Sequence, residues 1–348
     1  MSTRGGNNLI KKIVSLVLVG MFLLSLVGCS NNNNATKPPE SKTLKVVAAY
    51  GNKEQIFDAF TKDTGIKVEF LDMSSGEVLA RTEAEGGKPM ADVWFGGGLD
   101  SFIAAKNKGL LTKYESKEVA AIPQEYRDKD FYWYGVSLVT VGFMTNAEIL
   151  KQKGLPAPKT WADLKDPKYK GEVLIANPSI SGTNYAMLSC ILQTKGQEEG
   201  WKYFTELSKN VPFFSKRGGE PPTKVAAGEA AVGVIPISGE FFALKSKAPV
   251  ELYFPEDGIP WVPAGLAIFK NAQNLENAKA FVDWALSAKG QKIISEADPR
   301  VMVRPDVPVP DIMKDFSKDK LMKVDLEIFG IERTATLDAW DAKIGKKQ

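Results

Sequence analysis

The globular part of the chain begins with a strand–helix–strand unit, which restricts the folds available to it. Residues 44–50 are mostly apolar and stop at a glycine, so they predict a strand. Ile56, Phe57 and Phe60 fall on one face of a helix, and residues 66–70 alternate in polarity like a second strand. Two strands joined through a helix lie parallel, because the connection must return along the sheet. The unit therefore predicts a parallel sheet.

The same alternation continues through the rest of the chain and predicts an α/β protein. We expect further strands at 91–95, 172–176, 231–235 and 264–269, and helices from residue 76 and at 99–108, 182–194, 198–209 and 275–288. No repeat of fixed period is visible. Residues 132–146 form a long apolar segment that starts with aromatic residues and contains glycines. This segment predicts either a strand that passes between two lobes or a buried strand of one sheet.

Charge and composition exclude several classes of protein. The 348 residues include 45 Lys and Arg and 42 Asp and Glu. Arg4, Lys11 and Lys12 are the only charges before Cys29, so the remaining chain carries 42 of each sign. A balanced body argues against a nucleic-acid partner. Because there is no histidine and only Cys29 and Cys190 are cysteines, Ser-His-Asp and Cys-His catalysis, His-ligated zinc and a disulfide framework are excluded.

Residues 1–28 resemble a bacterial lipoprotein signal peptide. A positive start precedes an apolar run at 13–27, which at about 1.5 Å per residue is short for a bilayer core of roughly 30 Å. The run ends in Leu-Val-Gly-Cys, where Gly28 is the small residue at the cut and the Cys29 thiol accepts the lipid. An uncleaved anchor helix is the alternative. Residues 29–42 then predict a lipidated cysteine with a disordered tether, which holds the body on the outer side of the cytoplasmic membrane, at its periplasmic face or at the cell surface.

Five sequence motifs resemble one known family and occur in the family's order. The middle signature is Pro-Lys-Thr-Trp-Ala-Asp-Leu-Lys-Asp-Pro-Lys-Tyr-Lys-Gly at 158–171. The others are Phe-x-x-x-Thr-Gly-Ile at 60–66, Ala-Asp-Val-Trp at 91–94, Asn-Pro-Ser-x-Ser-Gly-Thr at 177–183 and Ala-Gly-Glu-Ala-Ala-Val-Gly at 227–233. Together with the signal, they cover nearly the whole chain. They resemble the extracytoplasmic solute-binding proteins of ABC transporters, in the group that binds ferric iron, thiamine, phosphonates and sugar phosphates.

This resemblance implies a fold and a set of partners. The fold is the type II periplasmic-binding-protein fold, with two α/β lobes joined by a hinge of two crossing strands. We expect residues 43–138 in lobe 1, residues 139–262 in lobe 2, and residues 263–348 back in lobe 1 with the C-terminal helices. The implied protein is a monomer without enzymatic activity, cofactor or metal. Its partners are a small anionic solute and an ABC permease with its ATPase.

Two predicted binding segments belong to lobe 1, where strand ends meet helix starts. Ser74 and Ser75 follow a strand and begin a helix, so their hydroxyls suit phosphate or carboxylate oxygens, although a plain helix cap explains them equally well. Gly97 and Gly98 allow close approach of the backbone, either to a ligand or around a tight turn.

The other predicted binding residues belong to lobe 2 and the crossover. Ser179, Ser181, Gly182 and Thr183 precede a helix and form the best candidate anion site in the chain. Arg217 lies beside two glycines and can hold two oxygens of a phosphate, although an exposed turn arginine is the alternative. Four aromatic residues near strand ends are candidates for the cleft wall, and we select the last of them as a site residue: Tyr50, Trp94, Trp133 and Trp261.

The class of solute that we expect depends on a pair of tyrosines that this chain lacks. Ferric members of the family use two adjacent tyrosines after the 227–233 motif, where this chain has Phe241-Phe242. We therefore expect a phosphonate or a phosphorylated organic compound, with ferric iron or thiamine as the alternative within the family. A membrane-tethered sensor and a hydrolase that uses carboxylates alone are the alternatives from other classes.

Overall fold

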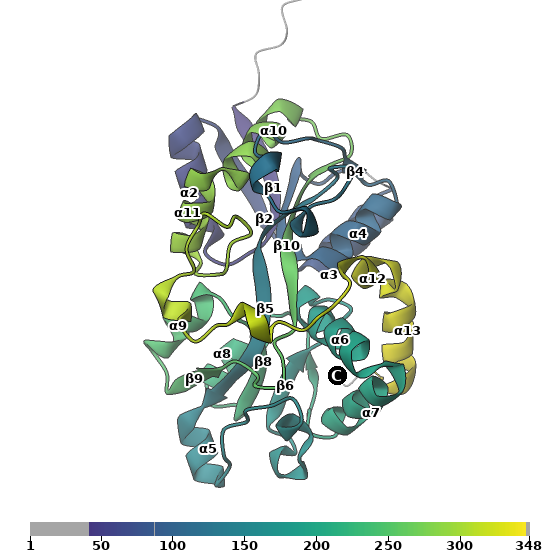
Figure 1. Cartoon of the computed structure of the whole chain (residues 1–348), viewed down its shortest axis with the longest axis vertical. Helices are drawn as coiled ribbons and strands as arrows, with labels where there is room; N and C mark the ends of the chain where they lie inside the picture. Colours follow the sequence, from purple (N-terminus) through teal and green to yellow (C-terminus); the bar gives the residue numbers. More distant parts are fainter. Residues whose placement is uncertain (1–41, 87, 346–348) are drawn as a thin grey trace, which may run out of the picture. The chain divides into compact units, whose positions relative to one another are not determined.

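The computed structural model describes residues 42–86 and 88–345 (Figure 1). The predicted signal peptide, Cys29 and nearly all of the predicted tether lie outside these residues. Among the helices of the described part, none is both long enough and apolar enough to cross a membrane.

The predicted α/β alternation is confirmed. Its first part contains β1 (Thr43–Ala49), α2 (Lys53–Thr64), β2 (Lys67–Asp72), α3 (Ser75–Ala84), β3 (Val93–Gly98), α4 (Leu99–Asn107) and β4 (Leu111–Thr112). The second part contains β5 (Tyr134–Asn146), α5 (Ala147–Lys153), β6 (Val173–Ala176), α6 (Gly182–Lys195), α7 (Gln197–Ser208), β7 (Phe214–Ser215), α8 (Glu220–Ala226), β8 (Val232–Pro236), α9 (Gly239–Lys245) and β9 (Val250–Tyr253). The chain continues with β10 (Trp261–Phe269), α10 (Leu275–Leu286), α11 (Ala288–Ala297), α12 (Leu326–Ile331) and α13 (Arg333–Lys343).

The strands pair in the order β2-β1-β3-β10-β5-β8-β6-β7, with β4 beside β10 and β9 beside β5. As predicted, β1 is parallel to β2. We call the part built from β1–β4, α2–α4, α10 and α11 lobe 1, and the part built from β6–β9 and α5–α9 lobe 2 (Figure 1).

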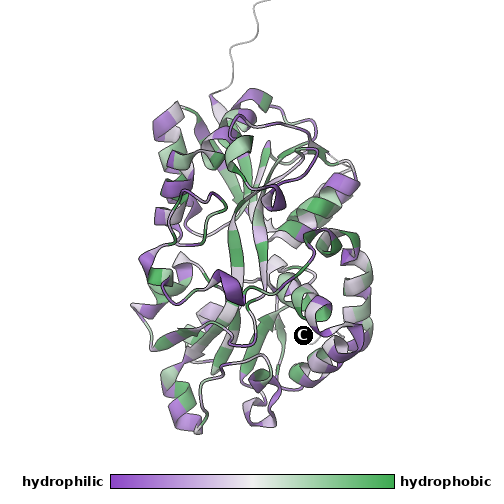
Figure 2. Cartoon of the chain, viewed as in Figure 1, coloured by the Kyte–Doolittle hydropathy of each residue, from purple (hydrophilic) through white to green (hydrophobic). Residues whose placement is uncertain are grey.

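Strands β5 and β10 connect the two lobes. The first half of β5 pairs with β10, and its second half, from Val141 to Thr145, pairs with β8 of lobe 2. Strand β10 continues into lobe 1, where it pairs with β3. Both strands are buried along most of their length and apolar in Figure 2. Most of the segment at 132–146 therefore forms β5, the strand that passes between the lobes, as the first of the two interpretations predicts.

Aromatic side chains form the core of each lobe. In lobe 1, Phe60 and Phe281 pack edge to face, with ring centroids 5.0 Å apart. In lobe 2, Trp340 of α13 packs against Phe204 and Phe214. The last contact corrects one expectation, because α13 lies on lobe 2 although we expected the C-terminal helices with lobe 1. The sequence could not show this, since an amphipathic helix does not identify the surface that it covers.

Candidate ligand-binding cleft

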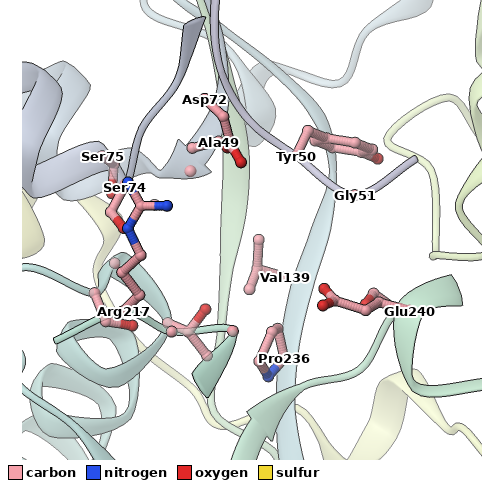
Figure 3. Close-up of a pocket in the computed structure, with 18 of the residues that line it drawn as sticks. Ala49, Tyr50, Gly51, Asp72, Ser74, Ser75, Val139, Arg217, Pro236 and Glu240 are labelled. Carbon is pink, nitrogen blue, oxygen red and sulfur yellow. The ribbon is translucent and has the colours of Figure 1, made fainter. Parts of the chain in front are cut away.

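A cleft of about 520 Å³ lies between the lobes, beside the crossing strand β5 (Figure 3). Lobe 1 contributes the residues that follow β1 and β2 and the last glycines of β3. Lobe 2 contributes the start of α6, the loop at 217–220 and the residues that follow β8. The predicted residues that line the cleft are Ser74, Ser75, Gly97, Gly98, Ser181, Gly182, Thr183 and Arg217. Strand ends and helix starts from both lobes therefore form one site, as expected for an α/β fold.

Ser74 and Ser75 both line the cleft but differ in their hydrogen bonds. Ser74 is the N-cap of α3 and forms a capping box with Glu77, whose carboxylate accepts the Ser74 backbone N–H at 2.9 Å. Ser75 is 2% exposed, and its Oγ has no hydrogen-bond partner among the described residues. A buried hydroxyl without a partner carries a desolvation cost. The Ser75 hydroxyl is therefore the group in this turn whose hydrogen-bonding capacity is unused among the described residues.

Glycines let the walls of the cleft approach each other closely, within lobe 1 at Gly97 and between the lobes at Gly98 and Gly182. Gly97 has a φ of +89°, and a Cβ atom there would lie 2.5 Å from the Ser75 Cβ. A Cβ on Gly182, the first residue of α6, would lie 2.6 Å from the Ser75 Oγ and 2.7 Å from the Gly98 backbone nitrogen. No other residue type fits these positions without a shift of the backbone.

Helix α6 begins at Gly182, as predicted, and Ser181 serves as its cap. The Ser181 Oγ accepts hydrogen bonds from the backbone N–H and the side-chain Nδ2 of Asn184, at 3.3 and 3.2 Å. Gly182 and Thr183 line the cleft at the first turn of the helix, where backbone N–H groups lack helical acceptors. Ser179 does not line the cleft, because its hydroxyl donates to Asn177 Oδ1 at 2.7 Å.

Arg217 extends from lobe 2 toward the start of α3 in lobe 1 (Figure 3). Its nearest carboxylate is that of Glu77, with 3.8 Å between Nη2 and Oε2, and about half of its side chain is exposed. A Cβ on the neighbouring Gly218 would lie 2.9 Å from Ser181 Oγ, so this loop packs directly on the α6 cap. The guanidinium therefore faces the two helix starts with most of its hydrogen-bonding capacity open.

Arg300 is a second cleft arginine, which the sequence analysis missed. It is 6% exposed, lies over the Tyr50 ring at 4.4 Å, and donates from Nε to Asp298 Oδ2 at 2.7 Å. Burial lowers the pKa of Arg300, but Asp298, Tyr50 and Glu240 together raise it above the ordinary value, so the guanidinium stays charged. It follows α11 in an irregular segment, where no periodic pattern indicates its direction.

Carboxylates balance the charge of the cations that line the cleft. Asp72, Glu220 and Glu240 line it together with the cations Lys53, Arg217 and Arg300. The Glu240 carboxylate points toward Val139 at the centre of the view (Figure 3). Burial and the charge of Asp298 raise the pKa of Glu240 above its usual value, against the effect of Arg300. Cations and carboxylates therefore alternate along the cleft: Arg217 and Glu220 belong to one loop, Lys53 pairs with Asp72 at 3.4 Å, and Arg300 interacts with Glu240.

Trp261 does not belong to the cleft. Its indole nitrogen donates to the Met322 backbone carbonyl at 2.9 Å, and its side chain lies by a separate surface pocket with residues 318–324. Trp261 begins strand β10 as its position at a strand end suggests, but its side chain does not line the cleft. Of the other aromatic candidates, Tyr50 lines the cleft, whereas Trp94 and Trp133 are core residues.

The side chains of the cleft suit oxyanion binding better than metal binding. Tyr50 is the one tyrosine that lines it, and its hydroxyl shares a 2.8 Å hydrogen bond with Ser137 Oγ. Burial raises the pKa of Tyr50, although the Arg300 charge opposes this, so the phenolate form is disfavoured. No cluster of three or more carboxylate or cysteine side chains suited to a metal occurs in the described part of the chain.

Comparison with known proteins identifies the family. Residues 88–324 match the family of bacterial extracellular solute-binding proteins. An uncharacterized protein of Haemophilus influenzae is 35% identical over 299 residues, which are 83% of this chain and 86% of that one. The Fe(3+)-binding periplasmic protein of Serratia marcescens is 26% identical over 246 residues, 68% of this chain and 71% of that one.

A solved structure confirms the fold. The periplasmic binding protein AfuA of Actinobacillus pleuropneumoniae, with exogenous fructose-6-phosphate bound, is 32% identical. It superposes with a TM-score of 0.81 over 87% of this chain and 99% of that one. The two-lobed type II fold, its interlobe cleft and the family match agree with the sequence motifs. The chain therefore belongs to the bacterial extracellular solute-binding proteins, the periplasmic binding components of ABC transporters.

Proposed function

We propose that this protein captures a small organic anion with a phosphate or phosphonate group in the interlobe cleft and delivers it to a membrane permease. The observation that carries the proposal is the buried, unpartnered Ser75 hydroxyl, which faces the first turn of α6 across the lobe boundary. A helix start offers N–H donors and a partial positive charge to an oxyanion. Arg217 adds a guanidinium on the same side.

The remainder of the solute lies toward Glu240 in this proposal. An ionised carboxylate only accepts hydrogen bonds, so Glu240 and Asp72 suit hydroxyl or ammonium groups. The cations and carboxylates that line the cleft are equal in number. A simple multivalent anion should therefore bind less tightly than a solute that also carries hydroxyl or ammonium groups. The fructose-6-phosphate bound to AfuA combines a phosphate with hydroxyl groups and supports this class.

Ferric iron or thiamine is the alternative within the family, and a ferric-binding relative exists in Serratia marcescens. The cleft argues against iron, since hard ferric ions prefer phenolate and carboxylate oxygens. Phe241 and Phe242 occupy the stretch where the resemblance would require tyrosines, and Phe241 is buried.

We also propose the location, the anchor and the lobe boundaries. The Leu-Val-Gly-Cys sequence supports lipidation of Cys29, which holds the mature protein on the extracytoplasmic side as a monomer beside its permease. Lobe boundaries near 138/139 and 262/263 fall within or next to the crossing strands β5 and β10.

The test is a thermal-shift panel of phosphonates, sugar phosphates, phosphoglycerates, thiamine and ferric salts. A ligand at 100 times its dissociation constant adds about 2.7 kcal/mol to the free energy of unfolding. We expect a phosphorylated compound to give the largest shift. Calorimetry with Ser181→Ala should then show affinity about tenfold weaker, because a hydrogen bond to a charged group contributes roughly 1.5–3 kcal/mol. Arg217→Ala tests the guanidinium, and a stabilising response to thiamine or iron alone contradicts the proposal.

A further inference from the structure

The C-terminal helices span the lobe boundary at the α4–α6 end of the cleft (Figure 1). Helix α12 packs along α4 of lobe 1, whereas Trp340 of α13 packs against Phe204 of lobe 2. Arg333 is the first residue of α13 and lies between these two contacts.

Arg333 forms hydrogen bonds with both lobes. Its Nε donates to Asp100 Oδ2 in lobe 1 at 2.7 Å, and its Nη2 donates to the Ser179 backbone carbonyl in lobe 2 at 3.2 Å. Its guanidinium also lies over the ring of Tyr185 of α6, at 5.6 Å. The Arg333 side chain is 13% exposed and that of Asp100 is 1% exposed. One buried cation therefore connects the start of α4 with the segment that leads into α6.

These two contacts adjoin the proposed anion site. A Cβ on Gly98 would lie 2.5 Å from Asp100 Oδ1 on one side and 3.1 Å from Gly182 Cα on the other. Ser179 lies two residues before the Ser181 cap of α6. Arg333 therefore fixes where Asp100 and Ser179 lie, and so how closely Gly98 approaches Gly182. That approach in turn sets the distance between Ser75 and the first turn of α6.

The surroundings of Asp100 make Arg333 hard to replace. Asp100 Oδ1 is buried without a hydrogen-bond partner among the described residues. Burial raises the pKa of Asp100, and the Arg333 charge opposes this effect. Loss of the guanidinium would leave a buried carboxyl without its compensating charge, and the start of α4 would move or take up water.

We propose that Arg333 is a positioning residue for the binding site: in this arrangement of the lobes it sets the separation of the lobe 1 and lobe 2 walls of the anion site without touching the solute. The affinity measurement that tests this inference rests on the proposed function, whereas the hydrogen-exchange measurement does not. A displacement of about 1 Å between two walls is enough to weaken a site that needs donors from both.

The experiment compares Arg333→Ala and Arg333→Lys with Arg304→Ala in the full chain. Arg304 is a matched control, because its side chain is 9% exposed and binds two carboxylates and the Leu286 carbonyl. None of these partners is among the residues that line the cleft, so Arg304→Ala removes a comparable guanidinium away from the proposed anion site. Amide hydrogen exchange is measured on each protein, and binding of inorganic phosphate is measured by calorimetry.

For Arg333→Ala we expect faster exchange in the first turns of both α4 and α6, with phosphate affinity about tenfold or more below that of the wild type. Arg333→Lys keeps the charge but not the planar guanidinium, so its exchange rates and phosphate affinity should lie between those of the wild type and Arg333→Ala. If Arg333→Ala does not fold, Arg333→Lys takes its place in the comparison. Arg304→Ala should change exchange near Glu118 and Leu286 and leave phosphate affinity close to the wild-type value.

Faster exchange confined to α12 and α13, or unchanged phosphate affinity in Arg333→Ala, overturns the inference. If the wild type binds neither inorganic phosphate nor any phosphorylated compound of the thermal-shift panel, the proposed function is contradicted. In that case the exchange of α4 and α6 still decides whether Arg333 positions the two walls.

Discussion

At the scale of single residues, two adjacent serines differ in their hydrogen bonds and therefore in the roles that we expect of them. Ser74 completes the capping box of α3, whereas Ser75 Oγ is buried without a partner beside Gly182. The sequence alone left both as either caps or ligand contacts. In the structure Ser74 caps α3, whereas the Ser75 hydroxyl has no hydrogen-bond partner among the described residues.

Ser75→Ala should therefore weaken binding of a phosphorylated solute by about tenfold or more, the range for a lost hydrogen bond to a charged group. The free energy of unfolding should hardly change, because no intramolecular hydrogen bond is lost. Ser74→Ala should show the reverse pattern, with about 1 kcal/mol of stability lost through the helix cap and a smaller effect on affinity. Calorimetry and urea unfolding of both variants check this, and equal affinities for Ser75→Ala and the wild type would be the contrary result.

At the scale of secondary-structure elements, α9 of lobe 2 is capped by a side chain that follows α11 of lobe 1. Asp298 is fully buried, and its Oδ1 accepts the Gly239 backbone N–H at 2.6 Å. Its other oxygen accepts from Arg300, and the Asn52 side chain donates to the Ala297 carbonyl nearby. Asp298 therefore joins a helix start, a cleft arginine and both lobes at the opposite end of the cleft from Arg333.

Asp298→Asn should lower the free energy of unfolding by about 3–5 kcal/mol, because it leaves the buried Arg300 without its compensating charge. Arg81→Ala is the control, since Arg81 and Glu85 form an exposed pair that contributes only about 0.3–0.5 kcal/mol. Both variants are compared by urea unfolding. Similar losses in the two would show that the Asp298 contact contributes no more than a surface pair.

At the scale of the whole molecule, the two lobes produce a cleft whose charges are balanced and whose one tyrosine is hydrogen-bonded to Ser137. This arrangement favours an organic oxyanion with donor groups of its own. It disfavours a ferric ion, which requires several anionic oxygens at one point.

The purified body should not bind ferric iron tightly. Tyr50 is held as a neutral phenol by burial, and Phe241 and Phe242 offer no ligand atom. Addition of ferric citrate should produce no phenolate-to-iron charge-transfer band in the visible spectrum. Appearance of that band, and its loss in Tyr50→Phe, would refute this expectation.

Cys29→Ala should release the protein from the membrane fraction or leave an unprocessed precursor. The reason is the Leu-Val-Gly-Cys site behind a short apolar run, which lies outside the described residues. Fractionation with metabolic lipid labelling checks this, and Cys190→Ala is the control, because Cys190 is buried in lobe 2. A mutant that stays lipid-labelled and membrane-bound would show that another residue carries the anchor.

The sequence by itself determined the fold class and most strands and helices, because hydrophobic periodicity and turn residues are local properties, and its five motifs carried the resemblance to the family. The signature at 158–171 has a structural role: Trp161 packs against Phe143 in the core of lobe 2 and does not line the cleft. Helix starts with serine and glycine also carry a local pattern, and for this reason Ser75, Ser181 and Gly182 could be predicted as candidate site residues.

Only the tertiary structure decided which candidates meet. Arg300, Asp298 and Arg333 follow no periodic pattern, and their partners are Tyr50, Gly239 and Asp100, which lie far away in the sequence. Trp261 had the right position at a strand end but does not line the cleft, because the direction of a side chain at a lobe boundary depends on packing between the lobes. Contacts between segments so distant in sequence form only when the strands assemble around β5 and β10, so no local sequence pattern predicts them.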